Sequence, residues 1–130
     1  MGMNYLFDSN TVIYFLGKIV LSDNALKRID AICSQGQHLS IITKLELLGY
    51  RFESAKNEES TKKFVKSSHI YQISPEIENE TIKLRKTTKI KLPDAIIAAT
   101  AIVHDFTLVS GNFKDFKAIT HLKLLNPFEL

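Results

Sequence analysis

The stretch LPDAIIAATAIV, residues 92–103, decides how this sequence folds. After its first turn the stretch is apolar on nearly every side of a helix, so a helix built from it has to be buried. Pro93 and Asp94 both suit the first turn of a helix, and they predict one that runs from Asp94 to His104. The apolar run at Thr107–Val109 follows closely and predicts a short buried strand.

Outward from this helix and strand, short apolar runs alternate with amphipathic stretches along the whole chain. The apolar runs predict strands at Met3–Phe7, His38–Ile42, His69–Ile73, Thr107–Val109 and, at a sheet edge, Lys123–Leu125. The other stretches predict helices at Ser9–Lys18, Asp23–Ser34, Thr43–Ser54, Glu58–Ser68, Pro75–Thr87 and Asp94–His104. Strands separated by helices pair in parallel through right-handed crossovers. We therefore expect an α/β fold of three layers, in which helices cover both faces of a mostly parallel sheet.

The composition is ordinary for a globular protein, and 130 residues suffice for one compact domain but not for two. We therefore expect a single domain over residues 1–130. No apolar run is long enough to span a bilayer, and the N-terminal residues lack the pattern of a signal peptide. These features, with a single cysteine, lead us to expect a cytoplasmic protein that has no membrane partner. The net charge of +3 mildly favours an anionic partner.

Four acidic side chains lie where an α/β fold places ligands, although each also has an ordinary structural explanation. Asp8 follows the first predicted strand and is also a good helix cap. Glu46 lies past the second predicted strand, in Thr43-x-x-Glu46, which is also the pattern of a capping box. Asp94 complements the dipole of its own helix, and Asp115 follows the fourth predicted strand in a polar turn.

Taken together, these four acids favour a catalytic interpretation. Three of them follow predicted strands and one opens a buried helix, and a doubly wound fold brings such positions to one cleft. Clustered carboxylates repel one another and cannot all ionise without a cation. Oxygen ligands of this kind suit Mg²⁺ or Mn²⁺, which then binds the phosphate of a substrate. The acids therefore predict a divalent metal site that acts on phosphodiester bonds.

Four motifs resemble those of PIN domains in their order and spacing, and they look most like those of VapC-type toxins. The motifs are Asp8-Ser9-Asn10, Thr43-x-x-Glu46, LPDAIIAATA at 92–101, and LVSGN at 108–112 followed by Asp115-Phe116. The resemblance covers essentially the whole chain, and the Pro-Asp-Ala segment is its most specific part. It implies a three-layer α/β/α sandwich and a Mg²⁺-dependent endoribonuclease, with Mn²⁺ as the alternative ion. Such an enzyme would cleave RNA with a metal-activated water.

The resemblance also implies roles for individual residues and partners. Asp8, Glu46 and Asp94 match three of the acids that bind metal and act in catalysis in the family. The fourth acid of the family often falls where this chain has Asn112, and Asp115, three residues later, is expected to substitute for it. The implied partners are an RNA substrate, a VapB-like antitoxin whose tail packs into the active-site groove, and a second copy of the chain in a homodimer.

Other polar residues are candidates for supporting roles. Four lie beside the acids and could orient ligands or water, although capping and turn roles compete equally well. They are Ser9, Asn10, Ser110 and Asn112. The densest basic stretch directly precedes the acid of the buried helix, and it is either a solvated helix face or a surface that holds RNA. It consists of Lys83, Arg85, Lys86, Lys89 and Lys91.

Two other functions fit the same motifs. One is a housekeeping PIN-domain nuclease that processes RNA, and the other is a PIN-like module that binds RNA or a protein without cutting. The amide at Asn112, in place of an acid, is the only feature that favours the non-cleaving module. Three intact acids argue against it, because a binding module has no need of buried charges that repel one another.

Overall fold

The structure is a computed structural model that describes residues 4–130. Its strands form one sheet in the spatial order β3-β2-β1-β4-β5, and all neighbouring strands are parallel. The strands are β1 (Tyr5–Phe7), β2 (His38–Ser40), β3 (His69–Tyr71), β4 (Thr107–Val109) and β5 (Lys123–Leu125). The predicted parallel sheet is confirmed, and β4 and β5 have the predicted bounds. Met3, which the sequence placed in the first strand, lies outside the described residues.

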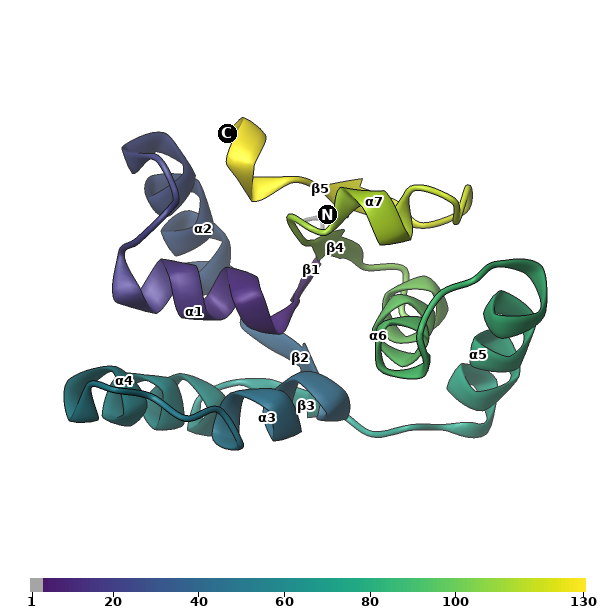
Figure 1. Cartoon of the computed structure of the whole chain (residues 1–130), viewed down its shortest axis with the longest axis horizontal. Coiled ribbons are helices and arrows are strands. Elements are labelled where there is room, and N and C mark those ends of the chain that lie inside the picture. The colour runs from purple at the N-terminus through teal and green to yellow at the C-terminus, as the bar shows by residue number, and fades with distance from the viewer. Residues whose placement is uncertain (1–3) are drawn as a thin grey trace.

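Helices connect the strands and cover both faces of the sheet. They are α1 (Ser9–Gly17), α2 (Asp23–Gln35), α3 (Ile41–Leu48), α4 (Ala55–Lys66), α5 (Pro75–Thr87), α6 (Leu92–Val103), α7 (Phe113–Phe116) and the 3-10 helix η1 (Pro127–Glu129). In Figure 1 the strands run between α1, α2 and α4 on one side and α5 and α6 on the other, which is the predicted three-layer arrangement. Within residues 4–130, no helix combines the length and the apolar character that crossing a membrane requires.

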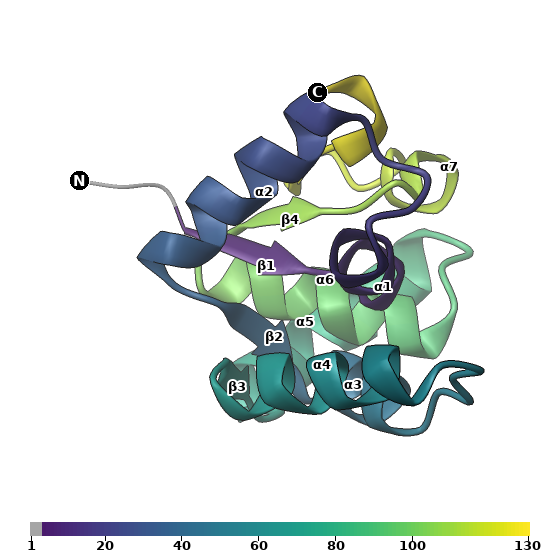
Figure 2. The ribbon, with the colours of Figure 1, turned by 90° about the vertical axis from the view of Figure 1, so that its left-hand side faces the viewer.

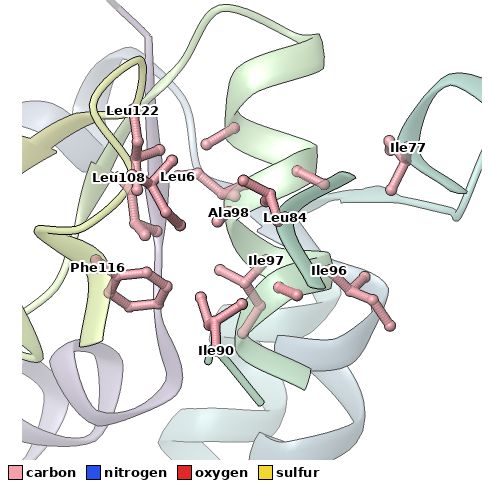
Figure 3. Packing of buried hydrophobic residues seen from close by; sticks show 14 of the residues in the cluster. Leu6, Ile77, Leu84, Ile90, Ile96, Ile97, Ala98, Leu108, Phe116 and Leu122 are labelled. Atoms are coloured by element: carbon pink, nitrogen blue, oxygen red, sulfur yellow. The ribbon is translucent and has the colours of Figure 1, made fainter. Parts of the chain in front are cut away.

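Neighbouring side chains of each strand point into two separate cores. Leu6 of β1 and Leu108 of β4 pack toward α5 and α6, whereas the next residue of each strand, Phe7 or Val109, packs under α1, α2 and α4. All four side chains are completely buried. Figure 3 shows the first core, in which Leu6 and Leu108 face Ile97 of α6. The strands are packed on both faces, and this packing fixes the positions of the residues at their ends.

The buried helix that the sequence predicted is α6, which begins two residues before the predicted start, at Leu92. All the residues from Ala95 to Ala101 are buried, as the lack of a polar face requires. The two ends of the helix are more open to solvent, and Asp94 lies partly exposed in the first turn. The helix therefore presents one acidic side chain at the edge of an otherwise apolar layer.

The turn from β2 into α3 differs from the prediction. The strand ends at Ser40 rather than Ile42, and α3 begins at once, because the Ser40 hydroxyl accepts a hydrogen bond of 3.1 Å from the N–H of Ile42. Thr43, predicted to cap the helix, is buried within it instead, and its hydroxyl oxygen has no hydrogen-bond partner among the described residues. The capping-box interpretation of Glu46 is therefore wrong.

Other boundaries also differ from the prediction, and the largest difference is the end of α3, which lies at Leu48 rather than Ser54. β3 ends at Tyr71, two residues early, and α4 begins at Ala55 rather than Glu58. The polar turn predicted after β4 contains α7 instead. Phe116, at the end of α7, is only 2% exposed and inserts into the first core, as Figure 3 shows. Burial of this ring stabilises a helix too short to form by itself.

All the strands end at the same edge of the sheet. The direction in which the chain adds strands reverses between β1 and β4, and a crevice is expected at this edge there. From β1 the chain moves outward to β2 and β3, and it then returns to the other side of β1 as β4 and β5. At such a reversal the loops after the two central strands diverge and leave room for a ligand. Figure 2 shows β1 and β4 pointing toward the side where α1 begins. Asp8 and Ser110 directly follow these two strands.

Candidate active site

Asp8 is held where β1 ends and α1 begins. Its Oδ1 accepts a hydrogen bond of 2.9 Å from the N–H of Thr11, so Asp8 caps α1 as its residue type predicted. Its Oδ2 accepts a hydrogen bond from the hydroxyl of Ser110, although 102 positions separate the two residues in the sequence. The Ser110 oxygen in turn accepts the N–H of Asn112 at 3.0 Å. Capping occupies only one carboxylate oxygen, so it does not exclude a second role for Asp8.

Burial makes the charge of Asp8 costly. The residue is only 9% exposed, and burial raises the pKa of its carboxyl above the ordinary value. The hydrogen bonds from Ser110 and Thr11 oppose this increase, and the negative charge of Glu46 adds to it. A cation at this position would favour the charged form, and a perturbed carboxyl of this kind marks a candidate functional site.

Glu46 projects from α3 toward the start of α1. Its Oε1 accepts a hydrogen bond of 2.6 Å from the hydroxyl of Ser9, which lies 37 positions earlier in the sequence. Because Ser9 directly follows Asp8, this bond brings the exposed carboxylate of Glu46 beside the buried one of Asp8. The supporting role predicted for Ser9 therefore has a geometric basis, since its hydroxyl orients Glu46.

The acids meet around Asp94, in the first turn of α6. Burial raises the pKa of its carboxyl, and the negative charges of Asp115, Glu46 and Asp8 raise that pKa further. Water and salt screen exposed charges, so an exposed carboxylate affects the pKa of Asp94 only when it lies nearby. The structure thus places Asp115, Glu46 and Asp8 near enough to Asp94 for their charges to act on its carboxyl. We call Asp8, Glu46, Asp94 and Asp115 the acid cluster.

Asn112 and Asp115 form a pair at the start of α7. The Nδ2 of Asn112 donates a hydrogen bond of 3.0 Å to the Oδ2 of Asp115. Asp115 is exposed, and among the acids it has the largest effect on the pKa of Asp94. The acid cluster therefore has four carboxylates even though residue 112 is an amide. Asn112 orients one of them, Asp115, through this hydrogen bond.

The acid cluster fits a hard divalent cation by its chemistry. Its side chains offer only oxygen donors, which Mg²⁺ and Mn²⁺ prefer, and a cation between them would oppose the raised pKa values of Asp8 and Asp94. Within residues 4–130, no three acidic, histidine or cysteine side chains already stand close enough to form a metal-binding group. Mg²⁺ commonly keeps several water ligands and binds through one or two carboxylates, so it does not need a closed cage of protein atoms.

One residue of the basic stretch lies beside the acid cluster. Lys91 is near enough for its positive charge to lower the pKa of Asp94. Arg85 instead donates a hydrogen bond of 2.9 Å from Nη1 to the carbonyl of Ile90, and this contact holds the loop between α5 and α6. The other members are exposed on α5 and on that loop, and they are Lys83, Lys86 and Lys89.

A pocket of about 260 Å³ adjoins the acid cluster at Asp8. Its lining contains the predicted residues Asn10 and Asn112 and four further residues, which are Thr11, Tyr14, Gly111 and Phe128. Sequence reasoning missed these four. The spacing Asp8-x-x-Thr11 is that of a capping residue and its bonded amide, so it could have revealed Thr11. Phe128 lies beyond the last strand, and no local pattern connects it with the acids.

Comparisons with known proteins agree with this architecture. The PIN domain family matches residues 5–122. A chain of a toxin–antitoxin complex from Klebsiella pneumoniae is 31% identical with a TM-score of 0.74, and the match covers 98% of this chain and all of that one. A chain of VapBC2 from Rickettsia felis, bound to a DNA fragment from its promoter, is 25% identical with a TM-score of 0.79, over 95% of this chain and 98% of that one.

A third similar chain comes from VapBC-1 of nontypeable Haemophilus influenzae, which is 26% identical with a TM-score of 0.74, over 96% of this chain and 98% of that one. The search of curated proteins found no match. The family match spans most of the sequence, and the strand order and the motifs around the acid cluster agree with it. This chain therefore belongs to the PIN-domain family.

Proposed function

We propose that this chain is a divalent-metal-dependent endoribonuclease that serves as the toxin of a toxin–antitoxin pair. The family match and the VapBC neighbours support a toxin nuclease. One observation carries the proposal to a metal-dependent reaction: burial raises the pKa of the Asp94 carboxyl, and the charges of carboxylates from separate elements raise it further. Such repulsion lowers the stability of the fold, and a bound cation would turn it into a binding interaction.

The acids would have different roles, according to how deeply each is buried. Asp8 and Asp94, whose pKa values are raised, would hold the principal Mg²⁺, or Mn²⁺ in its place. A bound ion of this kind neutralises phosphate charge and lowers the pKa of a water molecule. Glu46, exposed and oriented by Ser9, would position that water and accept its proton. Asp115 would offer a weaker second position for an ion.

Neighbouring side chains would support these acids. Ser110 would keep the carboxylate of Asp8 oriented through the hydrogen bond that it already donates. The side-chain oxygen of Asn112 would remain as a neutral ligand, because its Nδ2 is the atom that bonds Asp115. Lys91 would contact the phosphate backbone beside the acid cluster, and the remaining residues of the basic stretch would extend this contact in a salt-dependent way.

The chemistry predicts a particular pair of RNA ends. In-line attack by water at phosphorus would release the 3′ oxygen and leave a 5′-phosphate and a 3′-hydroxyl. The ribose 2′-hydroxyl would not be the nucleophile, so no cyclic phosphate would form. Purified protein, incubated with RNA and Mg²⁺, should produce these ends, and sequencing of RNA ends after brief induction in cells should identify the target. Ends with 2′,3′-cyclic phosphate would reject this chemistry, and uncut RNA would favour a non-cleaving module.

Glu46→Gln should separate catalysis from stability. Gln keeps an acceptor for the Ser9 hydroxyl and does not alter the start of α3, which Ser40 caps, so the unfolding temperature should stay nearly constant. The variant loses the group that accepts a proton, and cleavage should fall roughly 100-fold or more. Single-turnover cleavage and thermal unfolding measure the two effects. Unchanged cleavage would remove Glu46 from the mechanism.

The toxin part of the proposal includes partners and a place of action. The similar chains from Rickettsia felis and Haemophilus influenzae come from structures of VapBC complexes. We therefore include a VapB-like antitoxin, whose tail would pack against the acid cluster, and a homodimer of this chain. RNA and such an antitoxin would meet the protein in the cytoplasm. A small antitoxin gene directly upstream would argue against a housekeeping nuclease.

A further inference from the structure

The pocket beside Asp8 has aromatic walls that the proposed reaction does not use. Phe128 and Tyr14 both line it, and their ring centroids lie 6.0 Å apart with an angle of 49° between the rings. Phe128 is 48% exposed, so much of its ring remains open to a ligand. An aromatic surface directly beside carboxylates that would hold a cation is suited to a ligand that carries both a ring and a phosphate, because the cation would bind the phosphate and the ring would stack.

Local structure holds Phe128 in this position. The Oδ1 of Asn126 accepts the N–H of Phe128 at 3.0 Å and so caps η1, and the buried Pro127 anchors the same turn. The ring of Phe128 lies directly on Gly111, where a Cβ would collide with it. A glycine after β4 therefore allows an aromatic ring from the C-terminal segment to cover the loop that leaves the acid cluster.

Amide groups supply the polar part of the pocket. Asn10 is exposed at the start of α1, and Asn112 keeps its side-chain oxygen as an acceptor while its Nδ2 bonds Asp115. Amides both donate and accept, as the edges of nucleobases do. The volume of about 260 Å³ lies below the range of roughly 300–1,000 Å³ typical of drug-sized ligands, so the pocket suits one planar ring system.

We infer that this pocket binds one unpaired nucleobase of the RNA, next to the phosphate that lies at the acid cluster. Phe128 is the stacking surface, and the amide of Asn10 contacts the edge of the base. The inference rests on the proposed function and adds to it the choice of cleavage site. The stack on Phe128 holds the base, and the contact of Asn10 with its edge distinguishes one base from another. A base inside a duplex is already stacked and paired, so an unpaired base is the form that can enter the pocket.

RNA labelled with 2-aminopurine tests the inference, because stacking quenches the fluorescence of this base. The label is placed at successive positions around the mapped cleavage site, and binding is measured with Asp94→Asn as the background that does not cleave. One position should be quenched. Phe128→Leu should abolish that quenching and weaken RNA binding about fivefold to a hundredfold, the range for loss of one base–aromatic stack.

Two matched variants separate stacking from general damage. Phe113→Leu makes the same change at a phenylalanine that is 45% exposed but does not line the pocket, and it should leave quenching and binding unchanged. Phe128→Tyr keeps an aromatic ring and should keep the quenching. Thermal unfolding of all three variants shows whether the fold is intact, and the side-chain volume that leucine retains should preserve most of the contact with Gly111.

An abasic nucleotide at the quenched position makes the test specific. It should weaken binding to the protein that carries Phe128 but have little further effect on Phe128→Leu, because the two changes remove the same contact. Additive losses, or quenching that survives Phe128→Leu, would overturn the inference while cleavage by the unmodified chain still supported the proposed function. If the unmodified chain neither binds nor cleaves RNA, the proposed function fails and the inference fails with it.

Discussion

Asp8→Asn should abolish RNA cleavage and at the same time raise the unfolding temperature at neutral pH. The loss of cleavage follows from the removal of a charge that would hold the principal ion, and we expect a decrease of roughly a thousandfold. The gain in stability follows from burial. The charge of Asp8 is costly in the folded state, whereas Asn is neutral, nearly the same size and an equally good helix cap.

The gain in stability should depend on pH. The carboxyl of Asp8 has a pKa above its ordinary value of 3.8 in the folded protein, so between these two pKa values the folded state binds more protons than the unfolded state. The stability of the parent protein therefore falls as the pH rises through this window, and the variant escapes this decrease. The difference in unfolding temperature should be small near about pH 4 and larger at pH 7, at about 4 °C for each kcal/mol.

Asp105→Asn is the matched control for this experiment. Asp105 is exposed, forms a surface ion pair of 2.7 Å with Lys123 and has a φ of 57°, a conformation that asparagine also tolerates. The control should change neither cleavage nor the pH dependence of stability, because an exposed ion pair contributes little. A fully active Asp8→Asn would remove Asp8 from the site, and a loss of stability at every pH would show that its hydrogen bonds outweigh the cost of its burial.

Removal of divalent metal should stop cleavage and leave the protein folded. The two cores are apolar and lie on either side of the sheet, so they do not need a cation to form. Addition of Mg²⁺ should restore cleavage and raise the unfolding temperature as the ion concentration exceeds its dissociation constant. Cleavage assays and thermal unfolding with chelator, then with Mg²⁺, measure both effects. Cooperative unfolding on chelation would make the metal structural.

The Mg²⁺ requirement should respond to pH and to the charge of the cluster. The raised pKa values of Asp8 and Asp94 mean that binding releases protons, so half-maximal cleavage should need less Mg²⁺ as the pH rises through these values. Asn112→Asp adds a carboxylate and should lower the Mg²⁺ needed, whereas Asp115→Ala should raise it severalfold and weaken cleavage less than Asp8→Ala. Full activity of Asp115→Ala at low Mg²⁺ would reject the role of Asp115 alone.

Local sequence predicted helices and strands correctly wherever a single short-range signal had no competing signal beside it. Pro75 before an amphipathic run predicted α5 with its observed bounds, and the apolar run at Thr107–Val109 predicted β4. The alternation of such signals was enough to predict a parallel sheet in three layers. The sequence also singled out Asp8 and Asp94, since an acid after a strand or at the start of a buried helix is recognisable from its neighbours alone.

Tertiary structure alone decided which side chains meet. The bonds from Ser110 to Asp8 and from Ser9 to Glu46 join residues 102 and 37 positions apart, and they depend on a strand order that no local pattern encodes. The pKa increase at Asp94 likewise comes first from its burial and then from charges that belong to separate elements. Phe128 reaches the site only because β5 brings the C-terminal segment beside β4 and Gly111 leaves space for its ring. Hydrogen bonds, electrostatic repulsion and steric exclusion act over a few ångströms of space, and the fold determines which residues come within that distance.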